Sequence, residues 1–190
     1  NEELKHQGKY IKPIIGCEVY VAPRRKEQRD SRELDGANYH LILLAKNKTG
    51  YHNLIKIVSR AWTDGFYSHP RTDKYDLEKY REGLICSSAC LGGELPKLIT
   101  AGRLDEAEEV VQWFHGLFGD DYYLELQRHK ATVLNANHEV YQLQMNVNAH
   151  LKEMSVSSVS RLSAPTMSIF WMKRMPMHTN CLSVSLRDVL

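Results

Sequence analysis

Short apolar runs rich in β-branched residues alternate along the chain with longer segments whose apolar residues recur at helical spacing. The strand-like runs lie at 11–22, 39–45, 83–86 and 122–126. The helix-like segments lie at 54–62, 104–118 and 140–151. A buried strand requires an uninterrupted apolar run, whereas an amphipathic helix requires an apolar residue every three or four positions. Their alternation predicts an α/β fold with a largely parallel sheet.

The segments between these elements are expected to be loops. Residues 23–37 (PRRKEQRDSRELDGA) are highly charged and have no apolar periodicity, which predicts an exposed loop. Lys48-Thr49-Gly50 is expected to form a turn before the first helix. Asn137 can cap the helix that carries the apolar residues of 140–151.

Composition excludes several classes of protein. The chain has 25 basic and 23 acidic residues, and its net charge of +2 does not indicate a basic surface that binds nucleic acid. No apolar run approaches the roughly 20 residues of a membrane span, and no basic-then-apolar leader opens the chain. Four cysteines at irregular spacing do not form a disulfide framework. We therefore expect a soluble, cytoplasmic domain that does not associate with a membrane.

Residue usage changes sharply near position 154. Residues 155–190 contain four basic residues and one acid, whereas residues 1–154 contain 21 basic and 22 acidic residues. Five of the six methionines lie in 154–190. A disordered tail is usually rich in charge and poor in large apolar residues, yet this segment contains Ile169, Phe170 and Trp171 in succession. We therefore divide the chain into a domain at 1–153 and a tail at 154–190.

Three residues of metal-ligand type lie in or beside the predicted strands: Glu18, His40 and Cys90. From residue type alone, a buried and hydrogen-bonded polar residue is the commoner interpretation of Glu18 and His40. Cys86 and Cys90, spaced C-x-x-x-C, are a weaker candidate pair for zinc, because buried cysteine is common. The other histidines considered are expected on the surface: His129, His138 and His150. The sequence has no phosphate-binding glycine loop and no nucleophile elbow.

Five strings of sequence share the order and spacing of one known domain. They are KPIIGCEVYVA (12–22), NYHLILLAKNKTGYHNLIKIVS (38–59), GFYSHPRTD (65–73), EGLICSSACLGGELP (82–96) and YYLELQRH (122–129). Over residues 8–153 the chain resembles the polymerase and histidinol phosphatase (PHP) domain of bacterial DNA polymerase III alpha subunits. The resemblance implies a distorted β/α barrel that holds up to three divalent metal ions (zinc, manganese or magnesium).

The resemblance also assigns ligands. Glu18 in GCEVY, His40 in NYHLIL and Cys90 in SACL match metal-site positions of the family. Such a centre holds divalent ions close together and generates a hydroxide ion that attacks a phosphate ester. The family's first strand, with His-x-His, and a further histidine would lie before Asn1, and its late Asp-x-His motif is not found after residue 153. We therefore expect a partial barrel that lacks its first strands and its native C-terminal strands.

Two hypotheses account for the tail: the loss of one base in the codon after Glu153, or a lineage-specific tail that would match the junctions below only by chance. Joining the third base of each codon to the first two bases of the next forces Asp at Trp171–Met172 and Glu at Met172–Lys173, whatever the codon choice. The Met175–Pro176 and Met177–His178 junctions both force Ala. The remaining junctions permit a segment with the family's T-N-D-V-H motif. We interpret residues 154–190 as a frameshifted translation that does not fold natively.

The function implied for the parent protein is DNA-directed DNA polymerase, a nucleotidyltransferase that works with DNA and other replicase subunits. We expect the isolated 190 residues to be inactive, with the divalent metal lost or weakly bound, because the metal site is incomplete. Two alternatives remain open. One is a stand-alone, metal-dependent PHP phosphoesterase, and the other is a non-catalytic interaction module.

Overall fold

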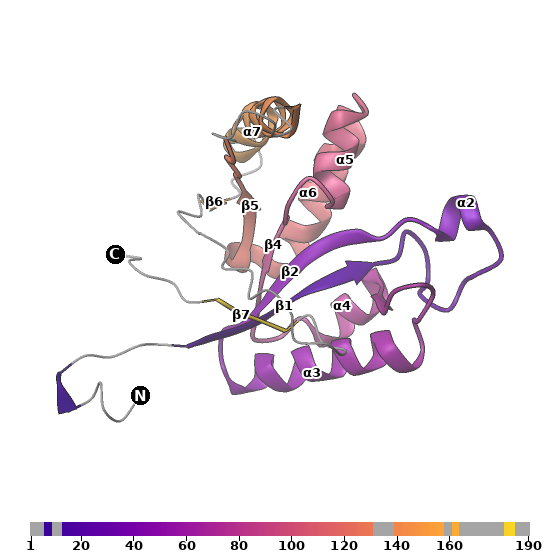
Figure 1. Cartoon of the computed structure of the whole chain (residues 1–190), viewed down its shortest axis with the longest axis vertical. Helices are drawn as coiled ribbons and strands as arrows, with labels where there is room; N and C mark the ends of the chain where they lie inside the picture. Colours follow the sequence, from indigo (N-terminus) through magenta and orange to yellow (C-terminus); the bar gives the residue numbers. More distant parts are fainter. Residues whose placement is uncertain (1–5, 9–12, 131–138, 158–160, 164–180, 185–190) are drawn as a thin grey trace.

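A computed structural model describes residues 6–8, 13–130, 139–157, 161–163 and 181–184. Its strands form one sheet in the order β3-β1-β2-β4-β5-β6, and β7 also pairs with β1 (Figure 1). The strand bounds are β1 Ile14–Val21, β2 Tyr39–Ala45, β3 Arg71–Thr72, β4 Leu84–Ser87, β5 Tyr122–Glu125, β6 Arg161–Ser163 and β7 Cys181–Val184. The path ends at β3 and β6, so the described residues form an open sheet.

The sheet is mixed, and the prediction of a largely parallel sheet is wrong for its centre. β2 is antiparallel to both β1 and β4, and β7 is antiparallel to β1. The β1–β3, β4–β5 and β5–β6 pairs are parallel. A parallel neighbour requires a long crossover connection, usually a helix. The connection from β1 to β2 contains only the four-residue helix α2, Arg32–Asp35, and the chain returns antiparallel.

Most predicted elements are present with shifted ends. The strand at 39–45 and the helix at 104–118 are confirmed as β2 and α6. The expected turn at 48–50 is instead the first turn of α3, because the side chain of Asn47 accepts a hydrogen bond from the Gly50 amide. The short helices α4 and α5 were not predicted. The remaining bounds are α3 Lys48–Thr63, α4 Lys74–Tyr80, α5 Glu94–Thr100, α6 Leu104–Phe118, the 3-10 helix η1 Gly119–Asp121 and α7 Glu139–Ser157.

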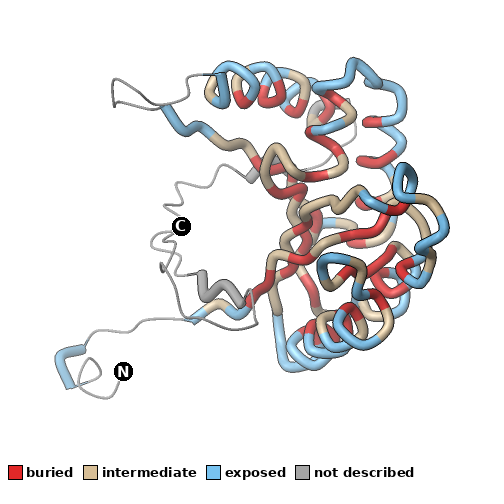
Figure 2. Tube along the Cα trace, turned by 45° about the vertical axis from the view of Figure 1, so that its right-hand side comes forward, coloured by how far each residue is buried: buried red, intermediate tan, exposed pale blue. Residues whose placement is uncertain are grey.

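The two faces of the sheet differ in burial. One face packs on the helices: α3 contacts β1, β2 and β4, and α6 contacts β4 and β5. Figure 2 shows the buried positions concentrated along the strands and the inner sides of the helices. The side chains that alternate with these buried ones point to the opposite face and are mostly half-buried. The buried face of the sheet includes Cys17, Val19, Val21, Leu41, Leu43, Leu84, Cys86, Tyr122 and Leu124.

The charged segment 23–37 is not simply an exposed loop, as the sequence suggested. The side chains of Lys26 and Asp35 are buried. The Lys26 ammonium lies 3.0 Å from Asp76, and Asp35 accepts two hydrogen bonds from Arg24. Arg71, also buried, donates to backbone carbonyls of this segment. Charged residues are buried here because each has a partner, and a search for apolar periodicity does not detect that.

The tail prediction falls mostly outside the described residues. Asn137, His138 and the reading-frame junctions at 171–178 all lie outside them. Helix α7 continues through Ser157 and buries Met154. Two short strands of the 154–190 segment, β6 and β7, pair with β5 and β1. In the part of the chain described here, no helix is long and apolar enough to cross a bilayer.

Candidate metal centre

Glu18, His40 and Cys90 meet on the sheet face that the helices leave open. In the β1–β2 register Tyr20 is opposite His40 and Glu18 is opposite Ile42. Glu18 and His40 are therefore diagonal neighbours that point to the same face. Cys90 lies in the loop between β4 and α5. Their ligand atoms all lie within 4.8 Å of one another, and no other such group of three occurs among the described residues.

The imidazole of His40 lies between the other two groups. Its Nδ1 is 2.5 Å from Oε1 of Glu18 and 3.4 Å from Sγ of Cys90. The side chains of His40 and Glu18 are 30% and 29% exposed, so solvent reaches the cluster. The neighbouring Cys90 sulfur and Glu18 carboxylate raise the pKa of His40 to about 9, against the opposing effect of burial. The cluster therefore stabilises a positive charge at its centre.

The loop that carries Cys90 is held against His40 by backbone contacts. The His40 amide donates to the Gly92 carbonyl at 3.1 Å, and the Gly92 amide donates to Cys90 Sγ at 3.4 Å. A Cβ atom at Gly92 would lie 2.9 Å from Nδ1 of His40, so a side chain there would displace the imidazole. Ala89 has φ of 62°, a strained value of the kind that occurs at functional sites.

Cys86 and Cys90 do not form a zinc-binding pair, because the side chain of Cys86 lies on the buried face of β4. Cys86 pairs with Leu43 in the register and is fully buried in the core. Burial raises the pKa of the Cys86 thiol well above its ordinary value, which opposes formation of the thiolate that binds metal. Cys86 therefore does not join Cys90.

Three other histidines were predicted to lie on the surface, and the outcome differs for each of them. His129 is exposed, as predicted, and its amide and Nδ1 are both hydrogen bonded to the side chain of Gln144. His150 is half-buried on α7 and its Nδ1 lies 3.0 Å from the Asn146 carbonyl. His138 lies outside the described residues. Neither His129 nor His150 belongs to the group of ligand-type residues on the open face.

Two aromatic residues beside the cluster were missed by the sequence interpretation. The ring of Tyr20 makes an edge contact with His40, with 5.1 Å between centroids, and lies 4.9 Å from the ring of His69. Burial and the charges of Glu18 and Cys90 raise the pKa of the Tyr20 hydroxyl, which keeps it protonated. Alternation along β1 places Tyr20 on the face of Glu18, and this was the available signal. For His69 the sequence offered no signal of this kind.

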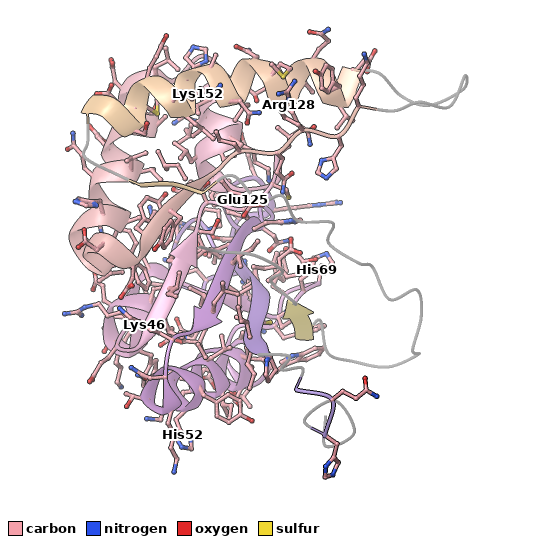
Figure 3. The ribbon with its side chains drawn as sticks, turned by 90° about the vertical axis from the view of Figure 1, so that its left-hand side faces the viewer. Lys46, His52, His69, Glu125, Arg128 and Lys152 are labelled. Carbon is pink, nitrogen blue, oxygen red and sulfur yellow. The ribbon has the colours of Figure 1, made fainter. Side chains whose placement is uncertain are left out.

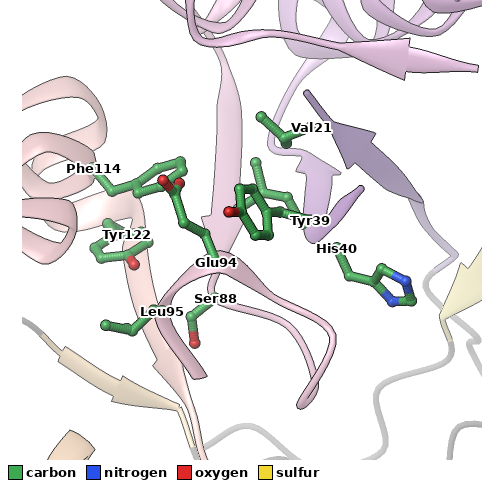
Figure 4. Close-up of a pocket in the computed structure, with 9 residues that line it drawn as sticks. Val21, Tyr39, His40, Ser88, Glu94, Leu95, Phe114 and Tyr122 are labelled. Atoms are coloured by element: carbon green, nitrogen blue, oxygen red, sulfur yellow. The ribbon is translucent and has the colours of Figure 1, made fainter. Parts of the chain in front are cut away.

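A small cavity adjoins the cluster on the side of the core. Figure 4 shows the carboxylate of Glu94 among the rings of Tyr39, Phe114 and Tyr122, with His40 at one side. The lining is otherwise mainly apolar and the space is about that of one water molecule. A substrate would therefore approach the cluster from the open face of the sheet.

A known protein family matches the part of the chain that contains this cluster. The PHP domain family matches residues 1–129, and the interval contains Glu18, His40 and Cys90. The chain belongs to the PHP domain family. The matched PHP region also includes Tyr20 and His69.

Curated relatives that are 40–54% identical to this PHP chain are named DNA polymerase III subunit alpha. The protein from Borreliella burgdorferi is 54% identical over 128 residues, which cover 67% of this chain and 11% of the relative. Those from Thermus aquaticus and Chlamydia pneumoniae are 46% and 40% identical, and the matches cover 63% and 84% of this chain. The chain spans about a tenth of the length of these relatives, 10% and 13% in the last two.

The three residues fit a divalent metal ion. Carboxylate, imidazole and thiolate are all zinc ligands, and three protein ligands with one open position are typical of catalytic zinc sites. Ligand atoms on one tetrahedral zinc ion lie roughly 3.3 to 3.7 Å apart, given the usual bond lengths. The Nδ1–Sγ distance of 3.4 Å agrees with this spacing, and the partly exposed Glu18 can move the short additional distance. The carboxylate of Glu18 beside His40 favours a cation in the same place.

Proposed function

We propose that this chain is the PHP region of a DNA polymerase III alpha subunit. The parent protein would be a cytoplasmic, DNA-directed DNA polymerase of chromosome replication that works with DNA and other replicase subunits. The names of the relatives support this assignment, and their match is confined to about a tenth of their length. We also propose that the open sheet is part of a PHP-type β/α barrel, which family membership supports.

Within this region, we propose that Glu18, His40 and Cys90 bind one divalent ion, and that this ion contacts the phosphoryl group of a phosphate ester. The observation that carries the proposal is the convergence of the three ligand atoms within 4.8 Å on the open face. The nitrogen and sulfur donors favour zinc over magnesium, which prefers oxygen ligands. A bound ion would supply Lewis-acid polarisation of a phosphoryl oxygen.

The protein groups around the ion position its ligands. The Gly92 amide holds the Cys90 sulfur, and the Gly92 carbonyl holds the backbone of β2 at His40. The protonated hydroxyl of Tyr20 is a hydrogen-bond donor close to Glu18 and Cys90. The described residues provide ligands for one ion, whereas cooperative phosphate hydrolysis commonly uses two ions about 3.5 to 4 Å apart. We therefore propose that this chain binds zinc weakly and without efficient turnover.

Titration of the 190-residue chain with Zn²⁺ tests this function. We expect one saturable site, measured by competition with a chromogenic chelator. With Zn²⁺ or Mn²⁺, we expect hydrolysis of bis(p-nitrophenyl) phosphate at no more than the rate of the metal ion alone. Absence of saturable zinc binding would refute the metal centre. Hydrolysis well above the metal-only rate would instead establish the alternative of a stand-alone phosphoesterase.

We further propose that residues 1–153 are the native domain and that 154–190 are frameshifted. The forced codon junctions and the change in residue usage support this division. The nucleotide sequence of codons 150–190 tests it. We expect that one added base after codon 153 restores T-N-D-V-H in an open reading frame. Codons that cannot encode this motif in the shifted frame would show that the tail is genuine.

A further inference from the structure

A second imidazole, that of His69, lies beside the metal centre. Its ring is 4.9 Å from the ring of Tyr20, whose other contact is the edge of His40 at 5.1 Å. Tyr20 therefore contacts both imidazoles. Figure 3 shows His69 next to the strands, whereas His52 projects from α3 at a distance from it.

The strand register also brings His69 toward the cluster. β3 runs parallel to β1, with Arg71 paired to Tyr20. His69 precedes Arg71 by two residues, as Glu18 precedes Tyr20. Corresponding positions on neighbouring parallel strands lie side by side. His69 thus lies two residues before the β3 residue that is paired with Tyr20.

The backbone holds His69 in a specific position. Ser68 has φ of 60°, and it is one of two described non-glycine residues with positive φ. The other is Ala89, so each of the two directly precedes a residue of this face, His69 or Cys90. The Tyr67 amide donates to the His69 carbonyl at 3.0 Å and closes the turn. Strain of this kind persists where the surrounding structure fixes it, often at functional sites.

The imidazole of His69 is available to a ligand. The residue is exposed, and its ring nitrogens have no hydrogen-bond partner among the described residues. His40, by contrast, is engaged by Glu18 and Cys90. The nearby guanidinium of Arg71 is fully buried and donates to backbone carbonyls. Of these three groups, only His69 can donate from the open face to an incoming molecule.

We propose that His69 binds a phosphate oxygen of a phosphate ester that reaches the ion held by Glu18, His40 and Cys90. This inference rests on the proposed function. A phosphate at that ion has oxygens that the metal does not contact, and these require hydrogen-bond donors. An imidazole N–H is such a donor at neutral pH. The Tyr20 ring supports the imidazole from the side of the cluster and so orients it.

Binding of thymidine 5′-monophosphate to the zinc-loaded chain tests the proposal. We expect His69→Ala to weaken nucleotide binding about tenfold, measured by isothermal titration calorimetry, since a hydrogen bond to a charged group is lost. The same variant is expected to change zinc affinity less than about twofold. In imidazole ¹H–¹⁵N spectra, the His69 signal is expected to shift when the nucleotide is added. His52→Ala is the matched control, an exposed histidine on α3, and is expected to change neither affinity.

The outcomes separate this inference from the proposed function. If the wild-type chain does not bind zinc, both fail. If zinc binds and His69→Ala binds the nucleotide as tightly as the wild type does, only the role of His69 fails. If His69→Ala weakens zinc binding as strongly as His40→Ala, His69 is a metal ligand and the proposed role in phosphate binding is wrong. Recovery of nucleotide binding in His69→Gln, which retains a side-chain donor, would support the proposal.

Discussion

Replacement of Arg71 by Met is expected to lower the free energy of unfolding by about 3 kcal/mol or more. The guanidinium is fully buried and donates to the carbonyls of Gly65, Asp35 and Lys26 at 3.2, 2.6 and 2.9 Å. A fourth contact, at 3.3 Å, reaches the Gln28 carbonyl. Removal of the side chain leaves these acceptors without their donor and opens a cavity between the 23–37 segment and β3.

The measurement is urea unfolding followed by circular dichroism. Because domains are typically stable by only about 5 to 15 kcal/mol, the midpoint is expected to fall markedly. Arg32→Met is the matched control: Arg32 is exposed on α2, and the expected change is within about 0.5 kcal/mol. Arg71→Lys retains the charge but loses the planar set of donors, and an intermediate loss is expected. An unchanged midpoint for Arg71→Met would show that the segment is held by other contacts.

Replacement of His40 by Ala is expected to weaken zinc binding at least about 100-fold, which corresponds to about 2.7 kcal/mol. His40 lies between the other two ligands, so its loss leaves Glu18 and Cys90 without the central donor. Loss of an outer-shell partner alone typically costs 10- to 100-fold in affinity, and a direct ligand contributes more. Competition with a chromogenic chelator measures the change.

The matched control for His40→Ala is again His52→Ala, for which unchanged zinc affinity is expected. Since the side chain of His40 is 30% exposed, the variant is expected to remain folded, with the circular dichroism spectrum of the wild type. Cys90→Ser and Glu18→Gln should each weaken binding in the same assay. If zinc affinity survives in all three variants, the ion binds elsewhere in the chain and the proposed centre is wrong.

Periodicity in the sequence predicted the elements whose apolar residues are themselves buried. β2 and α6 have the predicted bounds because their apolar residues face the core at the spacing of a strand or a helix. The seven-residue helices α4 and α5 were missed, since about two turns contain too few apolar positions to define a period. The charged 23–37 segment was misjudged because Lys26 and Asp35 are buried through ion pairs, Lys26 with the distant Asp76 and Asp35 with Arg24.

The candidate ligands Glu18, His40 and Cys90 were named from their types and from the resemblance to a family. By itself, the sequence also determined that strands and helices alternate and that residue usage changes near 154. Only the tertiary structure decided that β1 and β2 are antiparallel, and that register places Glu18 diagonally beside His40. Only it separated Cys86 from Cys90 and brought His69 to the ring of Tyr20. The physical reason is that the spacing of apolar residues specifies which face of a helix or strand is buried. The pairing and register of the strands specify which residues on those faces become neighbours.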